Sequence, residues 1–185
     1  MKVLLHICCA PCAIYPLETL RSSGTDVDGY YFNHNIHPYQ EYRRRLDTVR
    51  EYAALVRLNL ICHDEYRLEE FLAATAARPE ERCLYCYVSR LERAAQTAAE
   101  LGYESFTSSL LYSRYQQHEV IRREGELAAE RHGVRFLYHD YRPGWQQGIA
   151  RSKELGLYRQ QYCGCIYSEK DRYQPKPLRS GKVSP

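Results

Sequence analysis

The sequence predicts an α/β domain in which a mostly parallel sheet lies between two layers of helices. Short apolar runs typical of buried strands alternate with longer amphipathic helical patterns, an order that favours a doubly wound, Rossmann-like fold. The chain has 185 residues, enough for one well-buried domain. With 44% hydrophobic and 26% charged residues, it is neither a disordered acidic chain nor a membrane bundle. We expect one three-layer domain over residues 1–173 and a loosely ordered tail over 174–185.

The first half of the chain begins with a strand. Residues 3–7 are an apolar run around one histidine, and the residues after Pro11 predict a helix that runs to a stop at Ser22-Ser23-Gly24. An aromatic run over 28–33 predicts the second strand. Pro38 then begins a long helix, because apolar side chains recur after it at spacings of three and four. Residues 58–62 form the third strand.

The second half continues the alternation. A short helix is expected over 68–77, and a longer one over 86–102, where the final glycine is a typical C-terminal cap. Residues 105–107 predict a fourth strand, 116–132 a helix and 134–138 a fifth strand.

The chain contains eight cysteines, and seven of them form three short groups. The groups are Cys8-Cys9-x-x-Cys12, Cys83-x-x-Cys86 and Cys163-x-Cys165. Vicinal and closely spaced cysteines are poor partners for structural disulfides but suit thiolate ligation of a metal. Such grouped thiols indicate a reducing cytoplasm. The eighth, Cys62, ends an apolar strand and is expected to be a small buried hydrophobic residue.

Two of the motifs follow predicted strands directly. Cys8, Cys9 and Cys12 come after the first strand and run into the next helix, and the loop over 33–38 follows the second strand. In a doubly wound sheet, ligands bind outside the carboxyl ends of the strands. The sequence therefore predicts a metal site at this edge, to which the other two cysteine groups must fold back.

The cysteine spacing alone leaves three kinds of chemistry open. These are an iron–sulfur cluster, a structural zinc site and thiol–disulfide redox chemistry. Seven thiols exceed one tetrahedral site, so a [4Fe–4S] cluster with four ligands would leave three for a second metal or a dithiol.

Basic and aromatic residues form the second group of candidates. The chain has 26 Lys and Arg against 23 Asp and Glu, and its 18 tyrosines add flat phenol rings suited to unstacked bases. A GC-rich genome or thermophilic ion pairs would give a similar composition. The segment 108–116 offers hydroxyls and an arginine that either bind phosphate or cap a helix. No glycine-rich phosphate loop argues for bound ATP or NAD.

Four motifs together resemble the QueH family of epoxyqueuosine reductases. They are Leu-Leu-His-Ile-Cys-Cys-Ala-Pro-Cys at 4–12, the Tyr-Phe-Asn-His-Asn-Ile-His-Pro segment from 31, Cys83-x-x-Cys86 followed by Arg90-Leu91, and Leu-Tyr-Arg-Gln-Gln-Tyr-Cys-Gly-Cys at 157–165. The resemblance runs from residue 3 to about 168. Several motifs in this order are far more specific than a single C-x-x-C pair.

The resemblance implies a cytoplasmic, tRNA-modifying oxidoreductase with no membrane partner. It implies reduction of epoxyqueuosine to queuosine at the anticodon wobble position, with a [4Fe–4S] cluster and an additional iron or other divalent metal in place of cobalamin. Its partners would be tRNA bearing epoxyqueuosine and an external low-potential electron donor. Carried over by position, the metal ligands are Cys8, Cys9, Cys12, Cys83, Cys86, Cys163 and Cys165.

The reaction consumes two electrons and two protons, so a group must protonate the departing oxygen. The candidates are His37, Tyr115 and Asp140. The residues expected to bind substrate are Asn33, Asn35, Arg142, Tyr158 and Arg159. His37 and both asparagines follow the second strand, whereas Tyr158 and Arg159 adjoin Cys163.

Two other functions remain open at this point. A noncatalytic, zinc-stabilised RNA-binding module would use the same thiols as structural ligands. A cluster-dependent tRNA thiolase would need an ATP-binding glycine-rich loop after the first strand, where this chain has Cys-Cys-Ala-Pro-Cys.

Overall fold

The computed structural model describes residues 2–175 and has a five-stranded parallel sheet at its centre. The strand order is β3-β2-β1-β4-β5, and every neighbouring pair runs parallel. The strands are β1 (Lys2–His6), β2 (Asp26–Tyr31), β3 (Leu60–Cys62), β4 (Ser105–Ser108) and β5 (Arg135–Phe136). The predicted α/β class with a parallel sheet is confirmed.

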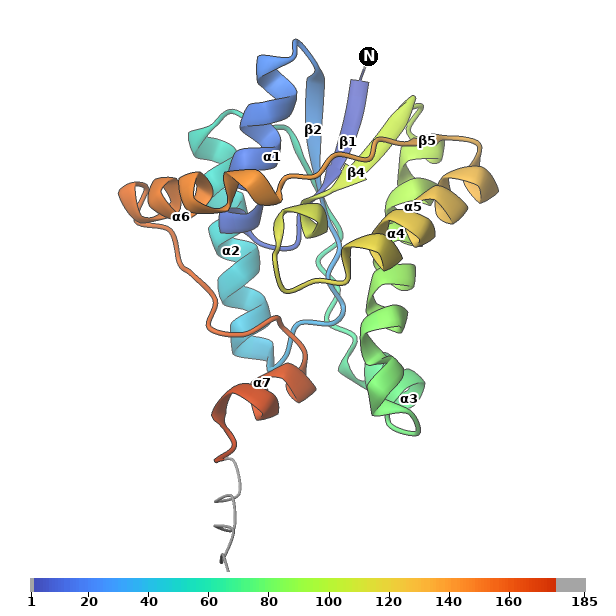
Figure 1. Cartoon of the computed structure of the whole chain (residues 1–185), viewed down its shortest axis with the longest axis vertical. Coiled ribbons are helices and arrows are strands. Elements are labelled where there is room, and N and C mark those ends of the chain that lie inside the picture. Colours follow the sequence, from blue (N-terminus) through green and yellow to red (C-terminus); the bar gives the residue numbers. More distant parts are fainter. Residues whose placement is uncertain (1, 176–185) are drawn as a thin grey trace, which may run out of the picture.

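Helices cover both faces of this sheet (Figure 1). They are α1 (Ala10–Ser22), α2 (Tyr39–Leu55), α3 (Leu68–Thr75), α4 (Arg82–Glu100), α5 (His118–His132), α6 (Trp145–Glu154) and α7 (Ile166–Tyr173). Helices α1, α2 and α6 lie on one side and α4 and α5 on the other. No helix among residues 2–175 is both long and apolar enough to cross a membrane.

The central strand β1 supplies both halves of the core. Leu4 and Leu5 are both fully buried, and because successive side chains of a strand point to opposite faces, they join different clusters. Leu4 packs with Leu91 of α4 and Phe106 of β4, whereas Leu5 packs with residues of α1 and α2 such as Leu46. Each helical layer is therefore held by the same strand.

The direction in which strands are added reverses at β1. Strands β2 and β3 extend the sheet on one side of β1, and β4 and β5 extend it on the other. The connections therefore separate at the carboxyl ends of β1 and β4, which leaves a crevice in such folds. Cys8 follows β1 and Ser109 follows β4, and the Cys8 N–H donates to Ser109 Oγ at 2.9 Å across this point.

The structure differs from the sequence expectations in three places. Helix α4 begins at Arg82, four residues before the expected start at Cys86, so Cys83 also lies in its first turn. A 3₁₀ turn over Pro79–Glu81 precedes α4 directly. Its first-position proline and two acidic residues favour a helix start at this point.

Helices α6 and α7 have weak apolar patterns and were not expected. The expected tail over 174–185 lies almost entirely outside the described residues.

A close approach at Gly148 fixes the position of α6. A β-carbon built at this glycine would lie 2.3 Å from Tyr112 Oη, which itself donates a hydrogen bond to the Trp145 carbonyl at 2.9 Å. Tyr112 is only 2% exposed and has little room to move. Only glycine lets α6 come this near to the turn after β4.

We expect Gly148→Ala to destabilise the fold by about 1–3 kcal/mol, because the added methyl overpacks a buried contact. Urea denaturation measures this loss. The matched control is Ala150→Ser on the exposed side of the same helix, with an expected change within about 0.5 kcal/mol. Equal midpoints for both variants would show that Tyr112 moves aside without cost.

Candidate metal centre and substrate cavity

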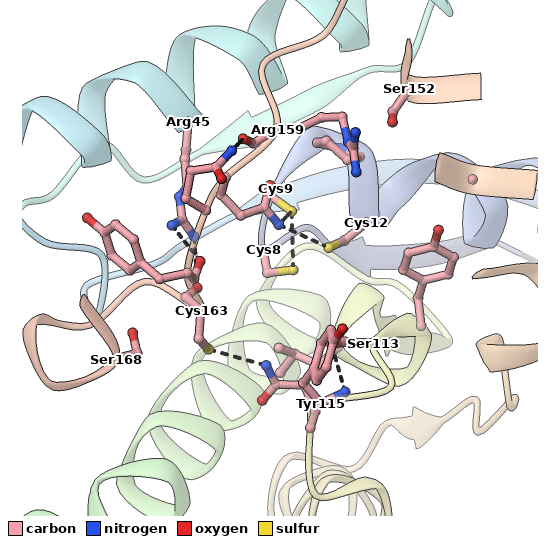
Figure 2. Close-up of a pocket in the computed structure, with 18 of the residues that line it drawn as sticks. Cys8, Cys9, Cys12, Arg45, Ser113, Tyr115, Ser152, Arg159, Cys163 and Ser168 are labelled. Carbon is pink, nitrogen blue, oxygen red and sulfur yellow. Dashed lines mark hydrogen bonds between the residues drawn. The ribbon is translucent and has the colours of Figure 1, made fainter. Parts of the chain in front are cut away.

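A cavity of about 800 Å³ opens at the carboxyl edge of the sheet, where β1 and β4 separate. Its lining includes Cys8, Cys9, Cys12 and Cys163, which come from opposite ends of the chain. Figure 2 shows the first three sulfurs together near the centre of this lining, with Cys163 to one side. A volume of this size holds a nucleoside-sized ligand.

Cys8, Cys9 and Cys12, called here the thiol triad, form the most compact group of potential ligands. Their sulfurs all lie within 4.8 Å of one another. The turn from β1 into α1 places them there, with Cys9 at the N-cap of α1 and Cys12 in its first turn. Ser109 adds a hydroxyl 3.3 Å from Cys8 Sγ. This group could hold a metal ion.

The local environment favours a thiolate within the triad. Hydrogen bonds with Cys12 and Cys9 lower the pKa of the partly buried Cys8 thiol well below its ordinary value, although desolvation opposes this shift. The same interaction with Cys8 raises the pKa of Cys12, and burial raises that of Cys9. The N-terminus of α1 also favours negative charge at this position.

A second thiol group combines α4 with the chain preceding α7. It consists of Cys83 and Cys86 in the first turns of α4, and of Cys163 and Cys165, the latter at the N-cap of α7. Burial raises the pKa of Cys86 to about 12, and the nearby charges of the other three cysteines add to this effect. Cys86 therefore lies close enough to the other three cysteines to be affected by their charge.

Arg90 connects the two thiol groups, and the sequence analysis did not assign it a role. It is 2% exposed and donates from Nη2 to Cys86 Sγ at 2.8 Å and from Nη1 to Asn33 Oδ1 at 3.3 Å. It also interacts electrostatically with Cys8 and Cys163. The spacing would have revealed it, because Arg90 lies four residues after Cys86 on the same helical face.

Arg45 holds the C-terminal thiols in place from α2. Its guanidinium is 3% exposed and donates to Glu41 at 2.7 Å, to the Cys163 carbonyl at 2.8 Å and to the Tyr162 carbonyl at 3.0 Å. Tyr158 donates to the other oxygen of Glu41 at 2.7 Å. Segment 157–165 has no regular secondary structure, so these contacts determine its path.

Two glutamine side chains donate hydrogen bonds to the sulfurs. Gln160 Nε2 lies 2.9 Å from Cys9 Sγ and 3.6 Å from Cys12 Sγ. Gln116 Nε2 lies 3.2 Å from Cys163 Sγ. The sequence analysis gave neither glutamine a role, although Gln116 ends the 108–116 segment and Gln160 lies in the 157–165 motif. Only the tertiary structure brings their amide groups to the sulfurs.

Of the three expected proton donors, Tyr115 alone lines the cavity. His37 is 1% exposed, and burial lowers its pKa to about 4, so its imidazole is neutral at pH 7. Asp140 forms a two-point ion pair with Arg142, which lowers the pKa of the carboxyl to about 2. The roles expected for His37 and Asp140 stay predictions.

The five residues expected to bind substrate lie in different surroundings. Arg159 lines the cavity and is exposed. Asn33 is fully buried and donates to the Ile7 carbonyl at 2.8 Å, and Asn35 is 2% exposed with no partner for its Oδ1. Arg142 pairs with Asp140 and Tyr158 bonds Glu41, so neither lines the cavity. Arg159 is therefore the member of this set with direct access to a ligand.

The chemistry of the donor set fits a thiolate-bound metal. Four thiols, those of the triad and of Cys163, line the cavity, and thiol ligands suit iron or zinc. The two buried guanidiniums of Arg45 and Arg90 offset the negative charge that seven thiolates would bring. N–H donors such as Gln160 and Gln116 reach the sulfurs, as they do in protein iron–sulfur sites.

Comparison with known proteins supports one family. The family model described as Epoxyqueuosine reductase QueH matches residues 3–171. The chain is 40% identical over 172 residues to the Epoxyqueuosine reductase QueH of Dehalococcoides mccartyi, with 93% of this chain and 94% of the relative covered. It is 36% identical over 180 residues to the protein of the same name from Thermotoga maritima, which covers 92% and 91% of the two chains.

A solved structure shares the fold. It is the crystal structure of a predicted subunit of tRNA methyltransferase from Methanocaldococcus jannaschii, with a TM-score of 0.58 and 14% identity. The match covers 83% of this chain and 75% of that one. At this identity the likeness concerns the α/β architecture alone.

The Arg45 contacts generate a stability prediction. We expect Arg45→Leu to lower the free energy of unfolding, measured by urea denaturation, by about 3–5 kcal/mol. The substitution leaves the largely buried Glu41 carboxylate without its cation. Hydrogen exchange should also rise in segment 157–165. The control is Arg78→Leu, which removes an exposed pair with Glu81 and should cost no more than about 1 kcal/mol. Unchanged exchange in 157–165 would mean that other contacts hold this segment.

Proposed function

This chain belongs to the QueH family of epoxyqueuosine reductases, oxidoreductases that act on tRNA, and on this basis we propose its reaction and cofactors. The reaction is reduction of epoxyqueuosine to queuosine at the wobble position, with an iron–sulfur cluster and a second metal and without cobalamin. The observation that carries the proposal is the meeting of the thiol triad and Cys163, from opposite ends of the chain, at one nucleoside-sized cavity.

The reaction is a deoxygenation. Both C–O bonds of the epoxide break, an alkene forms, and the oxygen leaves as water after taking up two electrons and two protons. When bound, the metals would supply single electrons and a Lewis acid. The protein must therefore position the epoxide beside the thiol groups and deliver protons to the departing oxygen.

The geometry favours a particular division of the ligands. In a tetrahedral site with metal–sulfur bonds of about 2.3 Å, sulfurs lie about 3.8 Å apart. The thiol triad, whose sulfurs fall within 4.8 Å, is compatible with one such ion. Cys83, Cys86, Cys163 and Cys165 supply the four thiolates that a [4Fe–4S] cluster takes. We assign the second metal to the triad and the cluster to these four.

The remaining side chains have roles that follow from their positions. Arg90 lies against Cys86 and close to Cys8, so its charge stabilises thiolates in both groups. Gln160 orients the sulfurs of Cys9 and Cys12. Tyr115 lines the cavity with a hydroxyl, so it is the proposed proton donor.

A tRNA loop fits the surroundings of the cavity. Single-stranded loop bases can be turned out and inserted into a pocket, whereas paired bases cannot. Arg159 is exposed beside the thiols and is free to contact a phosphate. The substrate places the reaction in the cytoplasm, and the electrons come from an external low-potential donor.

Anaerobic reconstitution followed by a mass assay tests the proposal. An anticodon stem-loop RNA carrying epoxyqueuosine should lose one oxygen atom on incubation with the iron-loaded protein and a strong reductant. Cys163→Ala should abolish this reaction while RNA binding persists. Cys62→Ala is the control and should react normally, because Cys62 ends β3 outside the cavity lining. Colourless protein with bound zinc and no reaction would instead support an RNA-binding module.

Metal analysis of two further variants tests the ligand division. We expect Cys83→Ala to lose most of its iron, its sulfide and the broad absorption near 400 nm. Cys12→Ala should keep the sulfide and the absorption and lose about one metal ion per chain. Loss of sulfide in Cys12→Ala with retention in Cys83→Ala would reverse the assignment.

A further inference from the structure

An aromatic side chain projects into solvent at the mouth of the cavity. Tyr115 is 85% exposed, the largest exposed fraction among the large apolar side chains that the structure describes. It lines the cavity together with Trp145 of α6, which is partly buried. Two rings placed at the entrance of a polar cavity offer flat faces to whatever remains outside it.

Trp145 packs against the turn after β4, and Tyr115 contacts its ring. The Trp145 ring stacks on Tyr112 at 5.2 Å and 27°, and Tyr112 Oη donates to the Trp145 carbonyl. Tyr115 meets the Trp145 ring edge-on at 5.7 Å and 80°. The Arg114 guanidinium lies 5.9 Å from the centre of the Trp145 ring. We call Arg114, Tyr115 and Trp145 the aromatic rim.

The charges near the rim favour a polyanion. Among the described residues, Arg114, Arg159 and Arg172 have no carboxylate partner, whereas surface arginines elsewhere commonly do, as Arg131 does with Glu92. Arg159 and Arg172 both line the cavity. Unpaired guanidiniums beside exposed rings are typical of surfaces that bind single-stranded nucleic acid.

The size of the cavity decides which nucleotide meets the rim. At about 800 Å³ it accommodates one modified nucleoside, so the neighbouring nucleotides of the same strand must stay at the mouth. An aromatic surface there stacks a base of any identity, because every base has a π face.

We infer that the aromatic rim stacks one of the two nucleobases adjacent to the modified base, with Tyr115 as its main contact. The inference rests on the proposed function and adds a second base-binding site to it. Tyr115 then contributes its ring to RNA binding and its hydroxyl to proton delivery, two roles that Tyr115→Phe separates.

Trp145 is the only tryptophan of the chain, so its fluorescence reports on the rim directly. Three stem-loop RNAs carrying epoxyqueuosine serve as probes: one intact, one abasic on the 5′ side of the modified base and one abasic on the 3′ side. The intact RNA should quench Trp145 emission of the metal-loaded protein. One of the two abasic RNAs should quench less and bind about 5- to 150-fold more weakly, the loss expected for one stacked base.

A double-mutant cycle shows whether Tyr115 is the partner of that base. Tyr115→Ala should weaken binding of the intact RNA by a similar factor. In this variant, the abasic change that weakened binding to the parent chain should lower the affinity by no more than about twofold. Tyr115→Phe should keep both affinity and coupling, whatever happens to its rate of reduction. The control Tyr39→Ala removes a half-exposed tyrosine outside the cavity lining and should behave as the parent chain does.

The outcomes separate the two proposals. Full additivity between Tyr115→Ala and both abasic changes, or unchanged Trp145 emission, would overturn the stacking inference even if reduction proceeds. A rim built for a protein partner would also be insensitive to the abasic changes and would overturn it. Coupling and quenching without any reduction of the base would support the rim and refute the proposed reaction.

Discussion

The concentration of thiols at one sheet edge is the constraint on which this structure depends. The seven sulfurs that we propose as metal ligands would carry negative charge, which a partly buried site tolerates only when cations are buried with it. Arg90 and Arg45 provide this charge from the two helical layers, one beside Cys86 and the other on the chain around Cys163. Each is almost inaccessible to water, so its charge is weakly screened.

The parallel fold explains why this edge can hold such a site. The divergence of connections at β1 and β4 leaves space, and the N-terminus of α1 directs backbone dipoles into it. The sheet alone positions only the thiol triad. The second thiol group requires α4 on one face and segment 157–165, held by α2, on the other, so both helical layers contribute to it.

The cavity divides into regions of different chemistry. Its interior has sulfurs with amide and guanidinium donors, which suits electron transfer and polar chemistry away from bulk water. Its mouth has exposed rings and arginines without carboxylate partners among the described residues, which suits a strand of RNA that must stay outside. This division fits an enzyme that acts on one base of a large polyanion.

The sequence by itself determined the α/β class, the order of most elements, and the first cysteine group at the carboxyl edge, because strand and helix periodicity and the strand-to-helix turn are local properties. Its motifs also identified the family. Only the tertiary structure decided that Gln160, Gln116 and Arg45 reach the thiols, since each depends on contacts between distant segments. Helix α6 was missed for the same reason: its position depends on the close approach of Gly148 to Tyr112, which no periodicity records.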